Sequence, residues 1–398
     1  SQIADDIGKL LPEFGAAANV SELRAVPQHV IRAPITRNTP LSRRVSRLVN
    51  SRPVSRLNRH LQLGLTKVAF PGAVHTRFEH VIGVLHVTTA YVRALYADRT
   101  SPIFRLVMNE ADITALLFAA VVHDCGHGAF SHYLEEWPAL FADCAHEDYA
   151  QEALRGEERW YSAHVDTVTR DRESLLAAAQ DWCHEEQNPS DFLHEVAEIL
   201  HPTTDPISAS FDTPIGVRAA KTHILHSILD SSMDADKLDY LRRDAVHAEV
   251  DYGKGIDIDR LFQSLTVATE RPTTGGEDEL VFAPTVAITP KGVLPLESFL
   301  QARYQMFNAL YWQHTARGAT AVIQYLVWRA LIPSTGRPSR IKFNRRRADL
   351  LEEFRVKDDR AALDSLEASL TAGRMSASRR IRLTRLIDAV RTESDFDG

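Results

Sequence analysis

Cysteine is scarce in this chain of 398 residues. The three cysteines, Cys125, Cys144 and Cys183, form no Cys-x-x-Cys pair, and an odd number cannot all pair within one chain. This usage favours free thiols in a reducing compartment, so we predict a cytoplasmic location. It also disfavours a closed structural zinc site, which would need several thiolates.

Long apolar stretches are missing as well. No run of 18 apolar residues occurs, and no basic segment followed by an apolar one opens the chain, so we predict no membrane partner and no secretory signal. Proline and glycine number 18 each, which is no enrichment and argues against wholesale disorder. The Gly-rich phosphate-binding motifs are also absent, so phosphates would need other partners.

An excess of positive charge is absent too. The formal net charge is -7, from 46 basic and 53 acidic residues, which disfavours a protein that coats nucleic acid. One local basic stretch, residues 337–347, leaves single-stranded nucleic acid open as a partner. Such a stretch is more often a solvated helix face than a binding site.

Apolar spacing predicts a mostly α fold. Apolar residues recur three and four positions apart in several regions, as on one face of a helix. The expected helices cover residues 78–96, about 109–126, 222–247 and about 296–331. Residues 280–292 are β-branched and contain Pro284, and so predict a small β-hairpin or edge strands.

We expect three regions along the chain. Residues 1–43 would be an N-terminal arm with little structure of its own, because they mix Pro, Arg and short apolar runs. Residues 44–332 would form the core, with a variable insertion at about 155–215, where the sequence is polar and its helical period is weak. Residues 333–398 would form a charged, helical C-terminal appendage.

A His-Asp pair stands at the end of one apolar helix. His123 and Asp124 would lie near a helix C-terminus, whose partial negative charge favours a cation, and a buried Asp is costly without a partner. One such pair is more often a structural hydrogen bond than a metal site. His80 and Asp236 on two other helices would complete a mixed nitrogen and oxygen set that suits one divalent ion, Mn, Fe, Mg or Zn.

The helix that carries Asp236 offers further polar groups. Asp236, Tyr240 and Asp244 are spaced four residues apart and share one stripe, and Lys237 is close enough to reach a phosphate oxygen. A solvated helix face is the alternative for this stripe.

Three histidines follow the His-Asp pair closely in the sequence. His127, His132 and His146 bring groups that titrate near neutral pH, and one of them could serve as a general acid. A lone histidine is more often a satisfied surface or core residue, and this alternative applies most strongly to His146.

Four segments together resemble a known family. They are FPGAVHTRFEH (70–80), HDCGHGAFSH (123–132), DADKLDYLRRD (234–244), and ESFLQARYQMF (297–307) followed by Tyr311. They resemble signature regions of the deoxynucleoside triphosphate triphosphohydrolases of the HD superfamily, the group of the bacterial dGTPase-like enzymes and the mammalian SAM- and HD-domain dNTPase. The resemblance runs from about residue 44 to 325 and implies an HD-domain helical bundle.

The resemblance also implies roles for individual residues. The divalent metal would be held by His80, His123, Asp124 and Asp236. The triphosphate would contact Arg77, Lys237 and Arg303. His132 would protonate the leaving 5′ oxygen with support from Glu135, and His127 and His146 would lie close to the phosphates. The sugar would contact Gln62, Tyr240 and Asp244, while Leu63 and Tyr311 would crowd its 2′ position and favour deoxyribose.

One residue and one short stretch depart from the family pattern. Glu135 stands where relatives usually have Asp, and its side chain is one methylene longer. Residues 312–314 read Trp-Gln-His, where relatives commonly place a Gln or His and a Lys. We find no SAM domain and no match to the family's regulatory nucleotide sites.

The resemblance predicts a metal-dependent enzyme. Water would attack the α-phosphorus of a dNTP and release a deoxynucleoside and inorganic triphosphate, through positioning and charge neutralisation more than covalent catalysis. A homo-oligomer is implied as well. Two alternatives stay open: an HD phosphohydrolase acting on another nucleotide or on single-stranded nucleic acid ends, and a dNTP-binding sensor with weak turnover.

Overall fold

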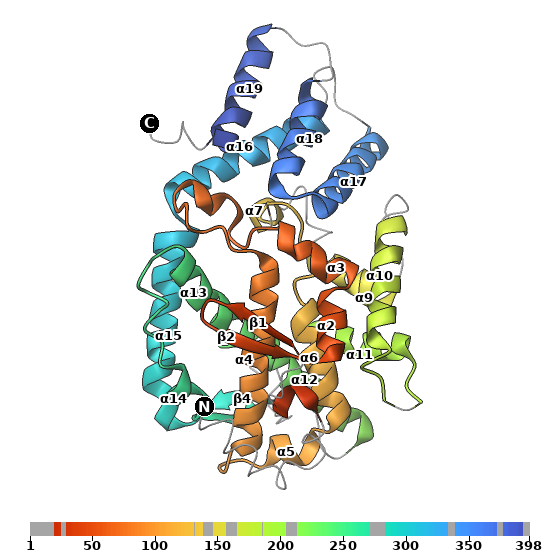
Figure 1. The fold of residues 1–398 in the computed structure, drawn as a ribbon, viewed down its shortest axis with the longest axis vertical. Helices are drawn as coiled ribbons and strands as arrows, with labels where there is room; N and C mark the ends of the chain where they lie inside the picture. The colour runs from red at the N-terminus through yellow and green to blue at the C-terminus, as the bar shows by residue number, and fades with distance from the viewer. Residues whose placement is uncertain are drawn as a thin grey trace, which may run out of the picture.

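The computed structural model confirms a mostly α fold (Figure 1). It describes residues 20–24, 29–130, 132–137, 146–156, 165–184, 186–203, 213–270, 283–332, 339–371 and 377–392. Cys144, residues 280–282 of the expected hairpin and Arg337 of the basic stretch lie outside the described residues. No helix in the described ranges is long and apolar enough to cross a bilayer.

Two helices rich in buried apolar residues form the centre of the molecule. The helix α4 (Arg77–Ala97) begins at Thr76, whose hydroxyl accepts a hydrogen bond from the Glu79 amide, as an N-cap residue does. The helix α6 (Glu110–Val122) begins with a reciprocal capping box between Asn109 and Asp112. The two helices pack together, and the predictions of helices at 78–96 and from Asn109 are confirmed.

The expected helix over 222–247 is wrong as a single element. The chain forms α12 (Pro214–Leu229) and α13 (Ala235–His247), separated by a turn. Asp234 ends this turn and caps α13, because its Oδ1 accepts from the Lys237 amide at 2.6 Å. The break places Asp236 in the first turn of a new helix that packs along α4.

The expected helix over about 296–331 is also interrupted. Helix α15 (Val293–Met306) continues as one π-helical turn, η7 (Phe307–Tyr311), and α16 (His314–Leu331) then starts behind a Gln313 cap. Gln313 Oε1 accepts from the Ala316 amide at 2.8 Å. A π turn is common where a functional side chain is presented, and this one presents Tyr311.

The polar region expected to be a variable insertion contributes to the core. Its described residues include part of α9 (His146–Arg155), and α10 (Val165–Ala179) and α11 (Pro189–Leu200). Trp182 and Phe192 are fully buried and meet Phe118 of α6 edge to face. The weak helical period of this segment therefore did not reveal its packing against α6.

Two antiparallel hairpins cross the helical body. Strands β3 (Leu265–Glu270) and β4 (Ala283–Ile288) pair with Thr269 opposite Pro284, which confirms a hairpin near 280–292, although its first strand was not expected. Strands β1 (His29–Ala33) and β2 (Arg37–Leu41) form the other. The interpretation of 1–43 as an arm with little structure is therefore wrong for residues 29–41, whose Leu41 is buried in the main core.

The C-terminal helices form a second apolar core at the top of Figure 1. The helices α17 (Arg340–Val356), α18 (Asp359–Thr371) and α19 (Ala377–Thr392) pack with α16, which confirms the prediction of a charged helical region there. Phe130 and Leu134 also belong to this core, so it reaches the segment that follows the His-Asp pair.

Short elements complete the chain. They are η2 (Ser21–Arg24), α2 (Arg43–Val49), α3 (Arg52–Ser55), η3 (Arg56–Arg59), η4 (Gly64–Val68), α5 (Ile103–Val107), α7 (His132–Glu135), α14 (Ile258–Phe262) and η6 (Pro290–Gly292).

Candidate active site

Three helices bring the expected metal ligands together. His80 lies in the first turn of α4, His123 caps the end of α6 and is followed by Asp124, and Asp236 lies in the first turn of α13. Asp236 Oδ1 is 2.8 Å from His80 Nε2 and 3.7 Å from His123 Nε2. The Asp124 carboxylate is 3.6 Å from His123 Nε2 and 4.0 Å from His80 Nε2.

This set of donors fits a divalent cation. Ligand atoms of His80, His123 and Asp236 lie within 4.8 Å of one another, and Asp124 adjoins both imidazoles. His123 Nε2 is buried and makes no hydrogen bond, while its Nδ1 bonds to the Ala120 carbonyl oxygen at 2.9 Å, which fixes the ring. A buried nitrogen held toward two carboxylates is the arrangement expected of a metal ligand.

The charges of the site lead to the same conclusion. Burial lowers the pKa of His80, but hydrogen bonds with Asp236 and Asp239 outweigh it and raise this pKa to about 10. Burial raises the pKa of Asp124, yet the charges of Arg77 and the neighbouring histidines hold it well below its usual range. Anionic carboxylates thus face cationic imidazoles, and a bound metal ion would take the place of the imidazole protons.

Asp239, which sequence reasoning missed, orients His80. Its Oδ2 accepts from His80 Nδ1 at 2.9 Å and from Arg243 Nε at 2.7 Å, and its Oδ1 accepts from Arg243 Nη2 at 2.7 Å. Arg243 also donates to Glu79 at 2.5 Å. Burial raises the pKa of Asp239, but the charge and hydrogen bonds of Arg243 outweigh it and lower this pKa to about 2.

Gly83 allows this carboxylate to approach α4. A Cβ atom at Gly83 would lie 1.9 Å from Asp239 Oδ1 and 2.2 Å from Arg243 Nη2, closer than any real contact. The absence of a side chain at this position therefore permits α13 to place the Asp239–Arg243 pair behind His80.

A second cluster lies beside the first. Glu135 Oε2 is 2.9 Å from His146 Nδ1 and 3.1 Å from His132 Nδ1, and Glu135 Oε1 is 3.4 Å from His127 Nδ1. His127 and His146 stack with ring centres 3.6 Å apart. The longer side chain of Glu135 thus reaches all three imidazoles, and the His132 side chain stays 60% exposed.

His127 joins the two clusters. Its Nε2 is 3.4 Å from Asp124 Oδ1, and its Nδ1 faces Glu135. Burial lowers the pKa of the His127 imidazole. Gly126 allows the approach of His146, because a Cβ there would lie 1.8 Å from the His146 carbonyl oxygen.

The predicted sugar contacts gather on α13 and the π turn. The Tyr311 hydroxyl donates to Asp244 Oδ2 at 2.8 Å, and the Tyr240 ring lies 6.0 Å from the Tyr311 ring, edge to face. Asp244 Oδ1 is also 2.7 Å from His75 Nε2, a partner that sequence reasoning missed. Leu63 is buried, and Gln62 bears a buried Oε1 that makes no hydrogen bond.

The three predicted phosphate contacts are placed unequally. Arg77 is buried beside the metal cluster and donates to Asp124 Oδ2 at 2.5 Å. The Lys237 ammonium bonds to Asp234 Oδ2 at 2.6 Å, so the helix cap holds it. Arg303 is half-buried, with its guanidinium 5.8 Å from the centre of the Phe307 ring. The structure therefore brings only Arg77 into direct contact with a candidate metal ligand.

The turn between α17 and α18 braces the segment that carries His127. Ala129 N donates to the Phe354 carbonyl oxygen at 2.7 Å, and Phe130 N donates to Asp359 Oδ1 at 2.8 Å. The buried Arg56 bonds to the carbonyl oxygens of His127, at 2.5 Å, and Arg355, at 3.0 Å. The C-terminal appendage thus holds the backbone on which the second cluster stands.

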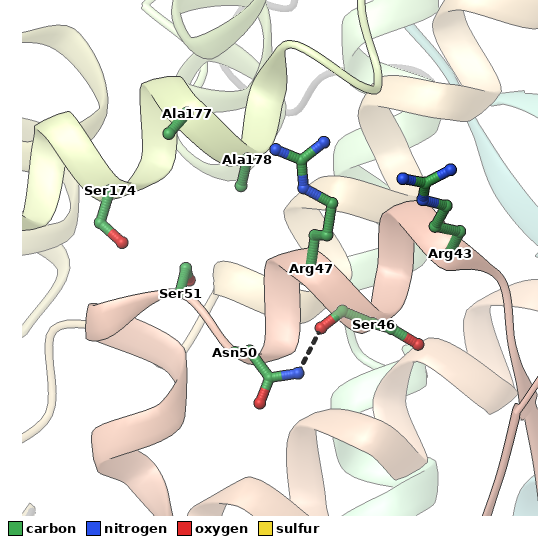
Figure 2. Close-up of a pocket in the computed structure, with 8 residues that line it drawn as sticks. All are labelled: Arg43, Ser46, Arg47, Asn50, Ser51, Ser174, Ala177 and Ala178. Atoms are coloured by element: carbon green, nitrogen blue, oxygen red, sulfur yellow. Dashed lines mark hydrogen bonds between the residues drawn. The ribbon is translucent and has the colours of Figure 1, made fainter.

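Basic surfaces lie apart from these clusters. A hollow of about 380 Å³ between α2 and α10 is lined by Arg43 and Arg47 together with serine, asparagine and alanine side chains (Figure 2). Arg47 is paired with Asp181 at 2.5 Å. On α17, Lys342 and Arg345 are exposed, as on a solvated helix face. Neither surface contains a predicted site residue.

Comparison with known proteins connects this geometry to a family. The model of the HD domain family matches residues 77–202, the stretch that contains both clusters except Asp236. The chain is 28% identical over 283 residues to the uncharacterized protein YwfO of Bacillus subtilis, covering 71% of this chain and 51% of that protein.

Two further relatives bear the name deoxynucleoside triphosphate triphosphohydrolase SAMHD1. The protein of Danio rerio is 28% identical over 246 residues, which cover 61% of this chain and 37% of that protein. The human protein is 28% identical over 225 residues, which cover 55% and 33%. The chain thus spans about half, or less, of the length of these curated relatives.

Proposed function

Because the chain carries an HD domain and is similar to deoxynucleoside triphosphate triphosphohydrolases, we propose that it hydrolyses dNTPs to a deoxynucleoside and inorganic triphosphate. One observation carries the proposal: two clusters, one suited to a divalent metal and one rich in histidine, lie side by side, and His127 of the second cluster contacts Asp124 of the first. Phosphoryl transfer needs charge neutralisation and a proton donor at adjacent points.

The first cluster would hold the metal. Its ligands would be His80, His123, Asp124 and Asp236, with Asp239 fixing the ring of His80. A divalent ion there supplies Lewis-acid activation of water and of the phosphate. Arg77 holds the Asp124 carboxylate in place and adds positive charge beside the triphosphate.

The second cluster would supply the proton. Glu135 bonds to His132 Nδ1, which leaves Nε2 of this exposed ring free to act as the proton donor. As water adds to the α-phosphorus, the bond from phosphorus to the 5′ oxygen breaks, and His132 donates its proton to that oxygen. His127 and His146 stack beside it and would contact the phosphates.

The sugar would be recognised on α13 and η7. Gln62 Oε1 is buried without a hydrogen bond, so it could accept the single hydrogen bond that a 3′-hydroxyl donates. Asp244 would be the other candidate acceptor for that one hydrogen bond. Leu63 and Tyr311 would leave little room at the 2′ position, so deoxyribose would be preferred. Tyr240 would stack near the sugar, and Lys237 and Arg303 would have to turn toward the phosphates to bind them.

Product analysis tests the proposal. The purified chain is incubated with each dNTP, each rNTP and a short single-stranded oligonucleotide, with Mn or Mg, and products are separated by anion exchange. We expect equimolar deoxynucleoside and triphosphate from dNTPs, no product from rNTPs, and none with Asp124→Ala. Shortened oligonucleotide would favour the nucleic-acid alternative, and dNTP-dependent thermal stabilisation without turnover would favour a sensor.

The native metal and the assembly are part of the proposal. We propose Mn, Fe, Mg or Zn as the resident ion, a homo-oligomer as the assembly and the cytoplasm as the location. Metal analysis of the purified chain, light scattering and localisation of a tagged chain test these points in turn.

A further inference from the structure

We propose that His127, His132, Glu135 and His146 form a second divalent-metal site, selective for a zinc-like ion, whose occupation stops hydrolysis. Ligand atoms of all four residues lie within 4.8 Å of one another. Three imidazoles and one carboxylate are a donor set that suits zinc, which favours nitrogen ligands and four-coordinate geometry.

The spacing of the donor atoms supports the site. Bonds of about 2.0–2.1 Å to a tetrahedral zinc ion place neighbouring donors about 3.3 Å apart. The distances from Glu135 oxygens to the Nδ1 atoms of His146, His132 and His127 are 2.9, 3.1 and 3.4 Å. These three distances are close to the spacing that a tetrahedral zinc ion requires.

The condition of His127 provides a second observation. Its side chain is fully buried, and neither ring nitrogen makes a hydrogen bond, although each lies 3.4 Å from a carboxylate oxygen. Burying an imidazole in this way costs free energy unless a ligand is bound, and a metal at Nδ1 would satisfy that atom. The ring is held by stacking on His146, so its Nδ1 already faces Glu135.

Glu135 is the residue that makes the set converge. Each of the three imidazoles belongs to a different part of the backbone: the segment after α6, the short helix α7 and the first residue of α9. A glutamate in α7 reaches across to all of them, and the 60% exposed His132 leaves a path for the ion to enter.

This site differs from the first in its ligands and in its effect. The first cluster uses His80, His123, Asp124 and Asp236, so the two sites share no ligand. The inhibitory effect rests on the proposed function: a metal on His132 removes the proton donor for the 5′ oxygen. General-acid catalysis contributes about 100-fold or more, so saturation of the second site would lower kcat by about that factor.

Zinc stoichiometry tests the site. Metal-free chain is titrated with zinc against a chromophoric chelator, comparing the parent, Asp236→Ala, His146→Ala and His132→Ala. We expect two zinc ions per parent chain and one per chain in each variant. Asp236→Ala should lose the ion of the first site, and His146→Ala and His132→Ala should each lose the ion of the second site. His194→Ala removes an exposed histidine of α11 and should still bind two. Circular dichroism verifies that each variant is folded.

The outcomes separate the two proposals. A parent chain that binds one zinc ion, or His146→Ala and His132→Ala variants that both keep two at unchanged affinity, would overturn the second site. Zinc added to the Mn-loaded enzyme should inhibit dNTP hydrolysis with a midpoint equal to the dissociation constant of zinc at the second site. A midpoint that differs from this dissociation constant would overturn the inhibitory effect. A chain that binds two zinc ions but hydrolyses no dNTP would keep the site and refute the proposed function.

Discussion

Replacing Asp239 by asparagine should weaken metal binding at His80 and leave the chain folded. The carboxylate accepts from His80 Nδ1 and from two nitrogens of Arg243, at 2.7 to 2.9 Å. Asparagine keeps the shape but removes the charge and turns one acceptor into a donor that faces a donor. His80 then loses the partner that fixes its ring and raises its basicity.

The size of the effect follows from this geometry. Loss of such an orienting partner typically weakens metal affinity by about 10- to 100-fold, or about 1.4–2.7 kcal/mol. The free energy of unfolding should fall by about 1.5–3 kcal/mol, because a hydrogen bond between charged groups is lost while Glu79 continues to bind Arg243.

The assay is Mn titration of the metal-free chain by calorimetry, with urea unfolding beside it. Asp251→Asn is the matched control, since that side chain is 97% exposed and lies outside the site. The reasoning is refuted if Asp239→Asn binds Mn within a factor of two of the parent, or if Asp251→Asn weakens binding as much.

Substitutions at three other positions probe the rest of the account. Asp359→Asn weakens the acceptor for Phe130 N and should shift the segment that carries His127. We therefore expect kcat to fall about tenfold while Mn affinity is unchanged. Equal losses in kcat and in Mn affinity would contradict this expectation. Tyr311→Ala should raise the ratio of kcat/KM for rNTPs to kcat/KM for dNTPs about tenfold, as steady-state kinetics on both substrates would show. Tyr311→Phe keeps the ring and loses only the bond to Asp244, so this ratio should not change. Burial lowers the pKa of His60 to about 3. Below pH 6.5 the unfolded chain therefore binds a proton at this residue that the folded chain does not bind. The free energy of unfolding should fall by up to ~1.4 kcal/mol per pH unit as the pH falls from 6.5 toward 3, while above pH 6.5 this loss is absent. Urea unfolding at pH 7, 6 and 5 measures how the free energy of unfolding depends on pH. The loss due to His60 should vanish in His60→Gln and should persist in His194→Gln, which changes an exposed histidine.

The central helices could be predicted because local signals agree along them. Apolar residues at helical spacing mark α4 and α6, and Thr76 and Asn109 mark their starts. The breaks at 230–234 and 312–313 escaped prediction because the apolar period continues across them. Only the caps reveal them, and Asp234 and Gln313 had not been interpreted as caps.

The candidate site was harder to predict beyond its four expected ligands. The structure brings His80, His123, Asp124 and Asp236 together, while their role as ligands stays a prediction. Asp239 lies in the same quoted segment, but one carboxylate in a segment that contains several charged residues gives no periodic signal, and its partner His80 is 159 positions away. The available clue was the spacing of Asp236 and Asp239, which are three residues apart on one helix and so lie on the same face.

The brace from the C-terminal turn could not be predicted at all. It consists largely of hydrogen bonds to backbone carbonyl oxygens, such as those of Phe354 and Arg355, which any residue provides. Among the C-terminal residues that make these bonds, Asp359 contributes a side chain, and an aspartate at the start of a helix is first interpreted as a cap.

Hydrolysis of dGTP in ¹⁸O-labelled water tests the central claim most directly. If the two adjacent clusters activate water at the α-phosphorus, the label will appear in the inorganic triphosphate, the deoxynucleoside will carry none, and Asp236→Ala will give neither product. Label in the deoxynucleoside, release of pyrophosphate in place of triphosphate, or full activity in Asp236→Ala would contradict the account.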